Sequence, residues 1–129
     1  PTMLAQKSGS IIFTASTAGR VCGEAHPNSS AYGASKAGLI NLARHAAVTY
    51  AKDGIRVNAI APGMHATNPI GMEVSKEDEQ RIFAAMSRVI PMGRFGQPSE
   101  IKGLAVFLAS DASSYVTGQT LGSDGGLTA

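Results

Sequence analysis

The stretch Asn28-Ser-Ser-Ala-Tyr-Gly-Ala-Ser-Lys36 opens a long segment of helix-forming composition. Ser29 or Ser30 can cap the amino end of that helix. Tyr32 and Lys36 stand four positions apart and therefore share one helix face. A positive charge close to a phenol favours the phenolate, which suits a group that exchanges protons near neutral pH. The spacing alone also fits a surface tyrosine and lysine on an ordinary helix, so the neighbouring segments must decide between these interpretations.

Strand-forming and helix-forming segments alternate along the rest of the chain. The segment 9–15 (Gly-Ser-Ile-Ile-Phe-Thr-Ala) is apolar and β-prone, which is typical of a strand buried on both faces of a parallel sheet. The expected elements are the end of a helix over 1–8, strands over 9–15, 55–61 and 119–123, and helices over 30–52, 75–89 and 98–109. This order predicts an α/β fold with about three parallel strands and flanking helices, in one domain over 1–129.

The helix over 30–52 is rich in small residues, including Gly33 and Gly38. Glycine lowers helix propensity, so its presence indicates that other backbone approaches closely, and we expect the helix to be packed on more than one side. Asp53-Gly54 follows, with glycine at the position that usually takes the left-handed conformation after a helix.

Composition and charge exclude several function classes. The net charge is +2 with no basic run, which argues against nucleic-acid binding. Cys22 is the only cysteine, so no internal disulfide is possible and a reducing, cytoplasmic location is expected. The three histidines are too far apart for a metal-ligand motif, so no metal site is expected. The apolar stretches are too short to span a membrane, and no signal-peptide layout opens the chain.

Six motifs in order resemble the carboxyl-terminal half of the short-chain dehydrogenase/reductase family. The motifs are Gly9-Ser-Ile-Ile with Ala15-Ser-Thr-Ala-Gly19, Tyr32-Gly-Ala-Ser-Lys36, Ile55-Arg-Val-Asn-Ala-Ile-Ala-Pro-Gly63 followed by Thr67, Pro91-Met-Gly-Arg-Phe-Gly-Gln-Pro-Ser-Glu100, Phe107-Leu-Ala-Ser-Asp111 with Tyr115-Val-Thr-Gly118, and Asp124-Gly-Gly126. The resemblance implies half of a doubly wound, Rossmann-like parallel sheet. In such sheets ligands bind beyond the carboxyl ends of the strands, where Ser16 and Pro62-Gly63 are expected.

The resemblance also implies a catalytic set. Tyr32 would exchange a proton with a substrate oxygen, Lys36 would assist it and hydrogen-bond the ribose of the cofactor, and Ser16 would hold the substrate oxygen. The implied cofactor is NAD or NADP, and the implied substrate is a small alcohol or ketone. The residues implied to bind the cofactor are Tyr32, Lys36, Pro62, Gly63, His65 and Thr67. Thr17, Cys22 and Met64 are candidates for lining the substrate pocket.

Each of these residues has a plainer interpretation as well. Ser16 could simply end a strand, Pro62-Gly63 could be an ordinary strand-ending turn, and Cys22 could be an idle thiol. At the position of His65, which could be only a loop residue, the family more often has an aliphatic residue.

The family's enzymes are about twice as long as this chain, and their first half holds the Gly-rich pyrophosphate turn and the residue that selects NAD or NADP. We therefore expect a fragment whose parent transfers a hydride between a nicotinamide cofactor and a secondary alcohol or ketone, while the fragment alone is inactive. The alternative is a non-catalytic pseudo-enzyme or assembly subunit that self-associates through the helix over 30–52 and the last strand. The family resemblance implies a homodimer or homotetramer.

Overall fold

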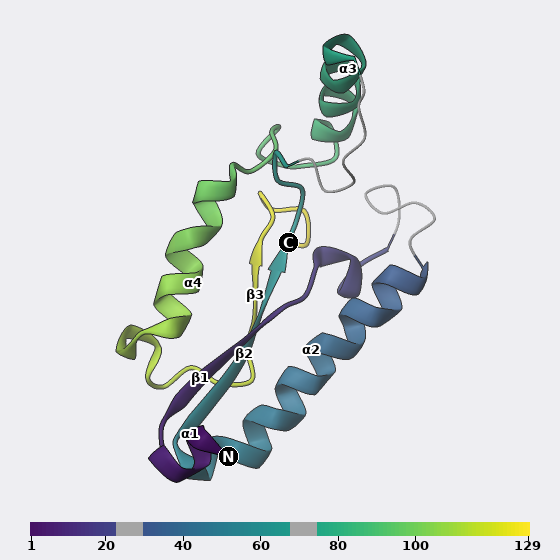
Figure 1. Ribbon diagram of the computed structural model, residues 1–129. Helices are drawn as coiled ribbons and strands as arrows, with labels where there is room; N and C mark the ends of the chain where they lie inside the picture. The colour runs from purple at the N-terminus through teal and green to yellow at the C-terminus, as the bar shows by residue number, and fades with distance from the viewer. Residues whose placement is uncertain (23–29, 68–74) are drawn as a thin grey trace.

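The computed structural model describes residues 1–22, 30–67 and 75–129. Its sheet has three parallel strands in the order β1 (Gly9–Thr14), β2 (Ile55–Pro62) and β3 (Thr120–Ser123) (Figure 1). The helices are α1 (Thr2–Gln6), α2 (Ser30–Tyr50), α3 (Lys76–Ser87) and α4 (Lys102–Ala109). Short 3-10 turns are η1 (Thr17–Gly19), η2 (Ala51–Asp53), η3 (Pro98–Ile101) and η4 (Asp111–Ser113). The predicted α/β class with parallel strands is confirmed.

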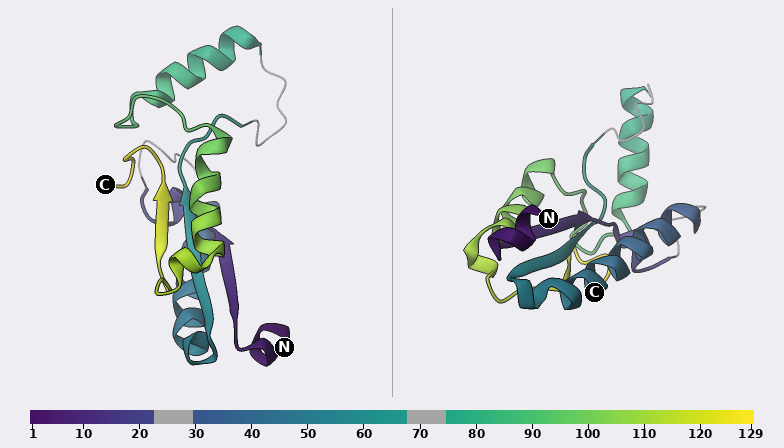
Figure 2. Two further views of the ribbon diagram at one scale, coloured as in Figure 1. Left: turned by 90° about the vertical axis from the view of Figure 1, so that its left-hand side faces the viewer. Right: turned by 60° about the horizontal axis from the view of Figure 1, so that its bottom comes forward.

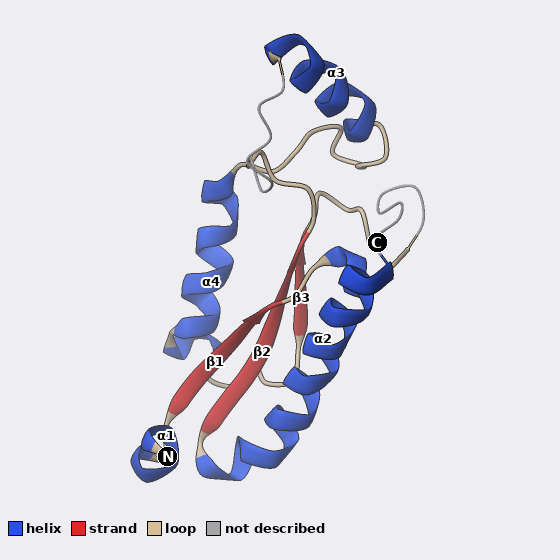
Figure 3. Cartoon of the chain, turned by 45° about the vertical axis from the view of Figure 1, so that its right-hand side comes forward, coloured by secondary structure: helices blue, strands red, loops and turns tan. Residues whose placement is uncertain are grey.

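Helices cover both faces of the sheet, as the sequence predicts for strands that are buried on both faces. The helix α2 lies on one face and α4 on the other, which two views show from different sides (Figures 2 and 3). The parallel register places Ile11 beside Val57 and Phe13 beside Ala59. The core on the α2 side unites the strand residues Ile11, Phe13, Val57 and Ala59 with Ile40, Ala43 and Ala47 of α2.

On the opposite face, one arginine joins the sheet to the end of α4. Arg56 of β2 donates from Nη1 to the Leu108 carbonyl at 3.0 Å and to Ser113 Oγ at 2.7 Å. Its Nη2 donates to the Ser110 carbonyl at 3.2 Å. The last carbonyls of a helix lack partners within the helix and carry the negative end of its dipole. A guanidinium therefore donates hydrogen bonds to these carbonyls and places a positive charge at that end.

The helix α3 stands beyond the carboxyl ends of the strands, away from α2 and α4 (Figure 1). The Ser75 hydroxyl accepts a hydrogen bond from the Asp78 amide at 3.1 Å and so caps the start of this helix. Phe83 contacts Phe95 with 4.4 Å between the ring centroids. Of the helices that the structure describes, none combines the length and apolar character that a membrane-spanning helix needs.

At two ends of predicted helices the structure has a 3-10 turn in place of α-helix. The helix expected over 98–109 begins as the 3-10 turn η3 before α4, and the last residues expected in the 30–52 helix form η2. Gly54 follows η2 with φ at 73°, so the left-handed cap is confirmed. Close packing accounts for Gly33 but not for Gly38, whose missing side chain would meet nothing within 4 Å.

Two glycine-to-alanine substitutions provide a test of this local structure. Gly54→Ala is expected to destabilise the protein by about 1–3 kcal/mol, because the left-handed conformation disfavours a side chain and the new Cβ would collide with the Lys7 carbonyl. At concentrations where the chain is monomeric, Gly38→Ala is expected to stabilise it by up to about 1 kcal/mol, because the helix favours alanine and space is open. Urea denaturation measures both, and equal changes of the same sign would contradict the assignment.

Candidate functional site

Two glycines bring the turn that carries Ser16 into backbone contact with α2. A Cβ at Gly19 of η1 would lie 2.6 Å from the carbonyl carbon of Lys36. A Cβ at Gly33 of α2 would lie 2.9 Å from the carbonyl oxygen of Ala18. Real Cβ contacts are not this short, so neither position accepts a side chain without a shift of backbone. The turn after β1 is therefore fixed against the helix segment that holds Tyr32.

Lys36 links the end of β1 to the Tyr32 ring. Its ammonium donates a hydrogen bond to the Thr14 carbonyl at 3.0 Å. The same nitrogen lies 5.5 Å from the centroid of the Tyr32 ring, a cation–π contact. The predicted sharing of one helix face by the phenol and the ammonium is thus present in the structure, and the anchor on Thr14 fixes where the charge lies.

The hydroxyl groups of Ser16 and Tyr32 are available for new hydrogen bonds. Ser16 Oγ accepts from the Ala18 amide at 3.2 Å, and it has no acceptor among the described residues for its own hydrogen. Tyr32 is half exposed, and its hydroxyl makes no hydrogen bond within the described parts of the chain. A hydroxyl with a free donor at the buried Ser16 and an accessible phenol at Tyr32 are polar groups that can bind a carbonyl or alcohol oxygen.

The end of β2 lies beside the Ser16 turn, as parallel pairing predicts. The Ala15 amide donates to the Ile60 carbonyl at 2.8 Å. Thr17 is fully buried, and its hydroxyl donates to the Pro62 carbonyl at 3.4 Å. This contact ties η1 to the end of β2, and the Thr17 side chain is not exposed to solvent. Gly63 packs so closely on Asp124 that a Cβ would lie 2.7 Å from that side chain.

The other predicted residues divide between two places. Met64 and His65, in the loop that follows β2, line a cavity of about 310 Å³. Residues at the end of β3 and in the carboxyl-terminal turn line it as well. Thr67 and Cys22 are exposed. The segment 23–29, which completes the predicted loop between Ser16 and Tyr32, lies outside the described residues.

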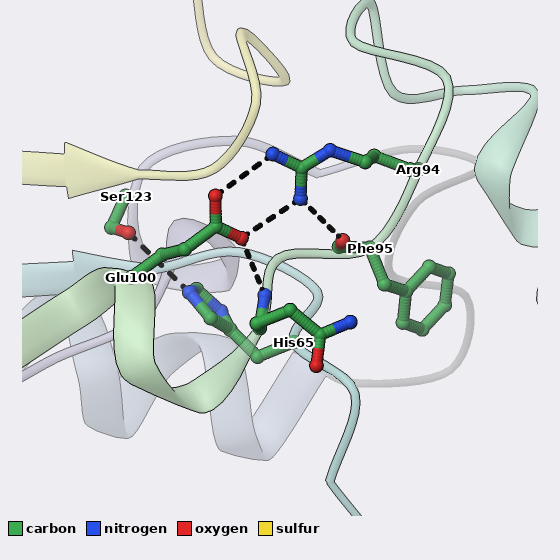
Figure 4. Close-up of polar contacts among 6 residues, drawn as sticks. His65, Arg94, Phe95, Glu100 and Ser123 are labelled. Atoms are coloured by element: carbon green, nitrogen blue, oxygen red, sulfur yellow. Dashed lines mark hydrogen bonds and ion pairs between the residues drawn. The ribbon is translucent and has the colours of Figure 1, made fainter.

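An ion pair that was not predicted from the sequence borders this cavity. Both guanidinium nitrogens Nη1 and Nη2 of Arg94 bind the Glu100 carboxylate at 2.8 Å (Figure 4). The Gln97 amide donates to the same carboxylate at 2.6 Å. The hydrogen bond from Arg94, followed by that from Gln97, lowers the pKa of Glu100 from 4.5 to about 2. The spacing Gln97-Pro-Ser-Glu100, a capping box, was the available signal.

The chemistry of the donor set fits the nicotinamide end of a dinucleotide. Hydroxyls at Ser16 and Tyr32 and the Lys36 ammonium are hydrogen-bond donors at the carboxyl ends of parallel strands, where such ligands bind. Within the described ranges, no group of three or more His, Cys, Asp or Glu residues could hold a metal ion.

The low pKa of Glu100 predicts how its ion pair responds to acid. The unfolded chain binds more protons than the folded one between the ordinary pKa of 4.5 and the folded pKa of about 2. The contribution of Glu100 to stability is therefore complete above this window and is lost as pH falls through it. The difference in thermal midpoint between the wild type and Glu100→Gln should shrink over the same window.

The control for this experiment is Glu77→Gln. Glu77 pairs with Arg81 at 2.8 Å with the two side chains 76% and 72% exposed, so its removal should change the midpoint much less. A wild-type advantage over Glu100→Gln that persists at pH 2 would contradict the assigned pKa.

Comparisons with known proteins agree with this geometry. A family model described as enoyl-(acyl carrier protein) reductase matches residues 1–128. Oxidoreductase UcpA of Escherichia coli K12 is 42% identical over 99% of this chain and 49% of its own length. A gluconate 5-dehydrogenase from Burkholderia cenocepacia, solved with NADP and tartrate, superposes with a TM-score of 0.86 at 35% identity, over 98% of this chain and 48% of that protein.

A 3-oxoacyl-[acyl-carrier protein] reductase from Brucella melitensis, solved with bound NAD, has a TM-score of 0.82 at 35% identity, over 100% of this chain and 44% of that protein. The chain thus spans about half the length of the relatives it matches. The family match, the parallel sheet and the Ser16, Tyr32 and Lys36 positions lead to one conclusion: the chain belongs to the short-chain dehydrogenase/reductase family.

Proposed function

We propose that this chain is the catalytic half of an NAD(P)-dependent oxidoreductase that acts on a secondary alcohol or ketone. The observation that carries the proposal is the position of the Lys36 ammonium, bound to Thr14 and lying over the Tyr32 ring. The Ser16 turn packs on the same helix through Gly19 and Gly33. Related proteins of known structure hold either NADP or NAD, which supports a nicotinamide cofactor of either kind.

The chain's residues divide the work around the reacting oxygen. When bound, the dinucleotide supplies or accepts the hydride. The Tyr32 hydroxyl gives a proton to the substrate oxygen in reduction and removes one in oxidation. Ser16 donates a hydrogen bond to that oxygen and stabilises the charge that develops there. Lys36 places a positive charge beside the phenol and would reach the ribose hydroxyls. Pro62, Gly63 and Thr67 at the end of β2 would contact the nicotinamide end.

Self-association through α2 is part of the same proposal. Leu42 and Val48 on this helix are 51% and 83% exposed, and Gly38 leaves open space beside it. Exposed apolar side chains and a small residue on one helix are the features that close helix packing between two copies would use. These features support a homodimer or homotetramer for the complete protein.

Replacing Tyr32 by phenylalanine in the full-length protein tests the proposed chemistry. Loss of the hydroxyl removes the proton-transfer group, so turnover should fall by about 100-fold or more while cofactor binding is nearly unchanged. Tyr115→Phe is the matched control, because Tyr115 is fully exposed and its substitution removes the same hydroxyl group at another place. Steady-state kinetics with NADH and NADPH measure both variants. Undiminished turnover in Tyr32→Phe would refute the role of Tyr32.

The 129-residue chain alone should bind dinucleotides weakly. Its described residues offer contacts to the nicotinamide end, whereas the pyrophosphate needs a Gly-rich turn at a helix amino end, which the sequence does not contain. Calorimetric titration of the isolated chain with NAD and with NADP should show no binding at micromolar ligand. A micromolar dissociation constant would show that the chain holds a complete cofactor site.

A further inference from the structure

The His65 ring is hydrogen-bonded at both of its nitrogens. Nδ1 lies 3.1 Å from the Gly63 carbonyl oxygen. Nε2 lies 3.3 Å from Ser123 Oγ at the end of β3 (Figure 4). A carbonyl oxygen only accepts, so Nδ1 must carry the hydrogen of that bond. In the neutral ring, Nε2 is then the acceptor and the Ser123 hydroxyl is the donor. The side chain thus links the loop after β2 to the neighbouring strand.

The ring also occupies a space that a glycine leaves open. A Cβ at Gly96 would lie 2.8 Å from Cδ2 of the His65 ring and 2.9 Å from its Nε2. The backbones are bonded in both directions at this point: the Gly96 amide donates to the Met64 carbonyl at 3.0 Å, and the Ala66 amide donates to the Gly96 carbonyl at 2.8 Å. His65 therefore joins three segments: its own loop, the end of β3 and the turn around Gly96.

The turn on which the ring rests is itself held by several bonds. Arg94 and Glu100 close it with two hydrogen bonds between the guanidinium and the carboxylate. Arg94 also donates to the Phe95 carbonyl at 3.0 Å, and the Gln97 amide donates to Glu100. A side chain that is bound to this turn restricts the motion of the loop to which it belongs.

We propose that His65 is a positioning residue that fixes the backbone of the loop over residues 63–67, here called the β2 loop. The proposal rests on the proposed function, in which this loop contacts the nicotinamide end of the cofactor. In this role the imidazole acts through Gly63, Ser123 and Gly96, in place of the direct contact with the cofactor that the family resemblance implied for His65. An aliphatic side chain at this position would fill space but make neither hydrogen bond.

Four variants of the full-length protein separate this role from simple packing. His65→Leu removes both hydrogen bonds and keeps an apolar side chain. His65→Asn keeps a donor at the place of Nδ1 and so retains the bond to the Gly63 carbonyl. His65→Gln can reach Ser123 but not Gly63 in the same way. Ser123→Ala removes only the bond at Nε2.

Four quantities are measured on each variant: cofactor affinity by calorimetry, kcat at saturating cofactor, the thermal midpoint, and hydrogen exchange of the β2 loop and of the turn around Gly96 by mass spectrometry. We expect His65→Leu to raise the dissociation constant about 10-fold or more, with kcat at saturating cofactor changed far less. Exchange of the amides of Ala66 and Gly96 should accelerate by a similar factor. His65→Asn should recover most of both losses, and Ser123→Ala should show a smaller loss than His65→Leu.

Wild-type affinity and exchange in His65→Leu would overturn the proposal. So would a fall in thermal midpoint with no rescue by His65→Asn, because that result describes packing alone. If the wild-type protein binds neither NAD nor NADP, the proposed function fails. The exchange measurement then still decides about His65: faster exchange in His65→Leu, reversed in His65→Asn, upholds its hold on the β2 loop, and unchanged exchange overturns it.

Discussion

The backbone contact between η1 and the first turns of α2 is the constraint on which the candidate site depends. Gly19 and Gly33 remove the side chains that would separate the turn from the helix. Because the approach is backbone to backbone, the Ser16 hydroxyl and the Tyr32–Lys36 pair are fixed relative to each other by the packing of two elements. Lys36 strengthens the same junction through its hydrogen bond to Thr14. The proposed catalytic arrangement, which needs defined positions for three side chains, is thereby built on rigid structure.

The parallel sheet supplies the second requirement, a common edge for these groups. The register of β1 against β2 brings the ends of both strands to one level, and β3 continues that edge. Buried Asn58 holds the segment that leads into β3, since its side chain donates to the Val116 carbonyl at 2.9 Å and accepts from the Gln119 amide at 3.0 Å. Both polar atoms of the buried Asn58 side chain thus have partners, and the two bonds fix the β2–β3 alignment. Ser16 therefore lies just beyond β1, while Pro62 and Ser123 are the paired last residues of β2 and β3.

Beyond the strand ends, a polar network replaces the apolar core as the source of order. Glu100 collects hydrogen bonds from Arg94 and Gln97, and His65 rests against Gly96 within the same region. The Phe83–Phe95 contact joins α3 to this turn, so the helix that stands apart from the sheet is connected to the β2 loop through a few residues. Each link is partly exposed, and its strength depends on geometry and on the number of bonds more than on burial.

The sequence by itself determined the order of the elements, the shared face of Tyr32 and Lys36, and the left-handed turn at Gly54, because each depends on residues close together in the chain. The Gln97–Glu100 capping box was equally local and was within reach of the same reasoning. Only the tertiary structure decided that His65 bonds Ser123, 58 positions away, and that Arg56 binds the end of α4. Periodicity reports which side chains share a face of one element. It does not indicate which distant segment of backbone packs against that face. That is determined by the packing of glycines and strands against one another.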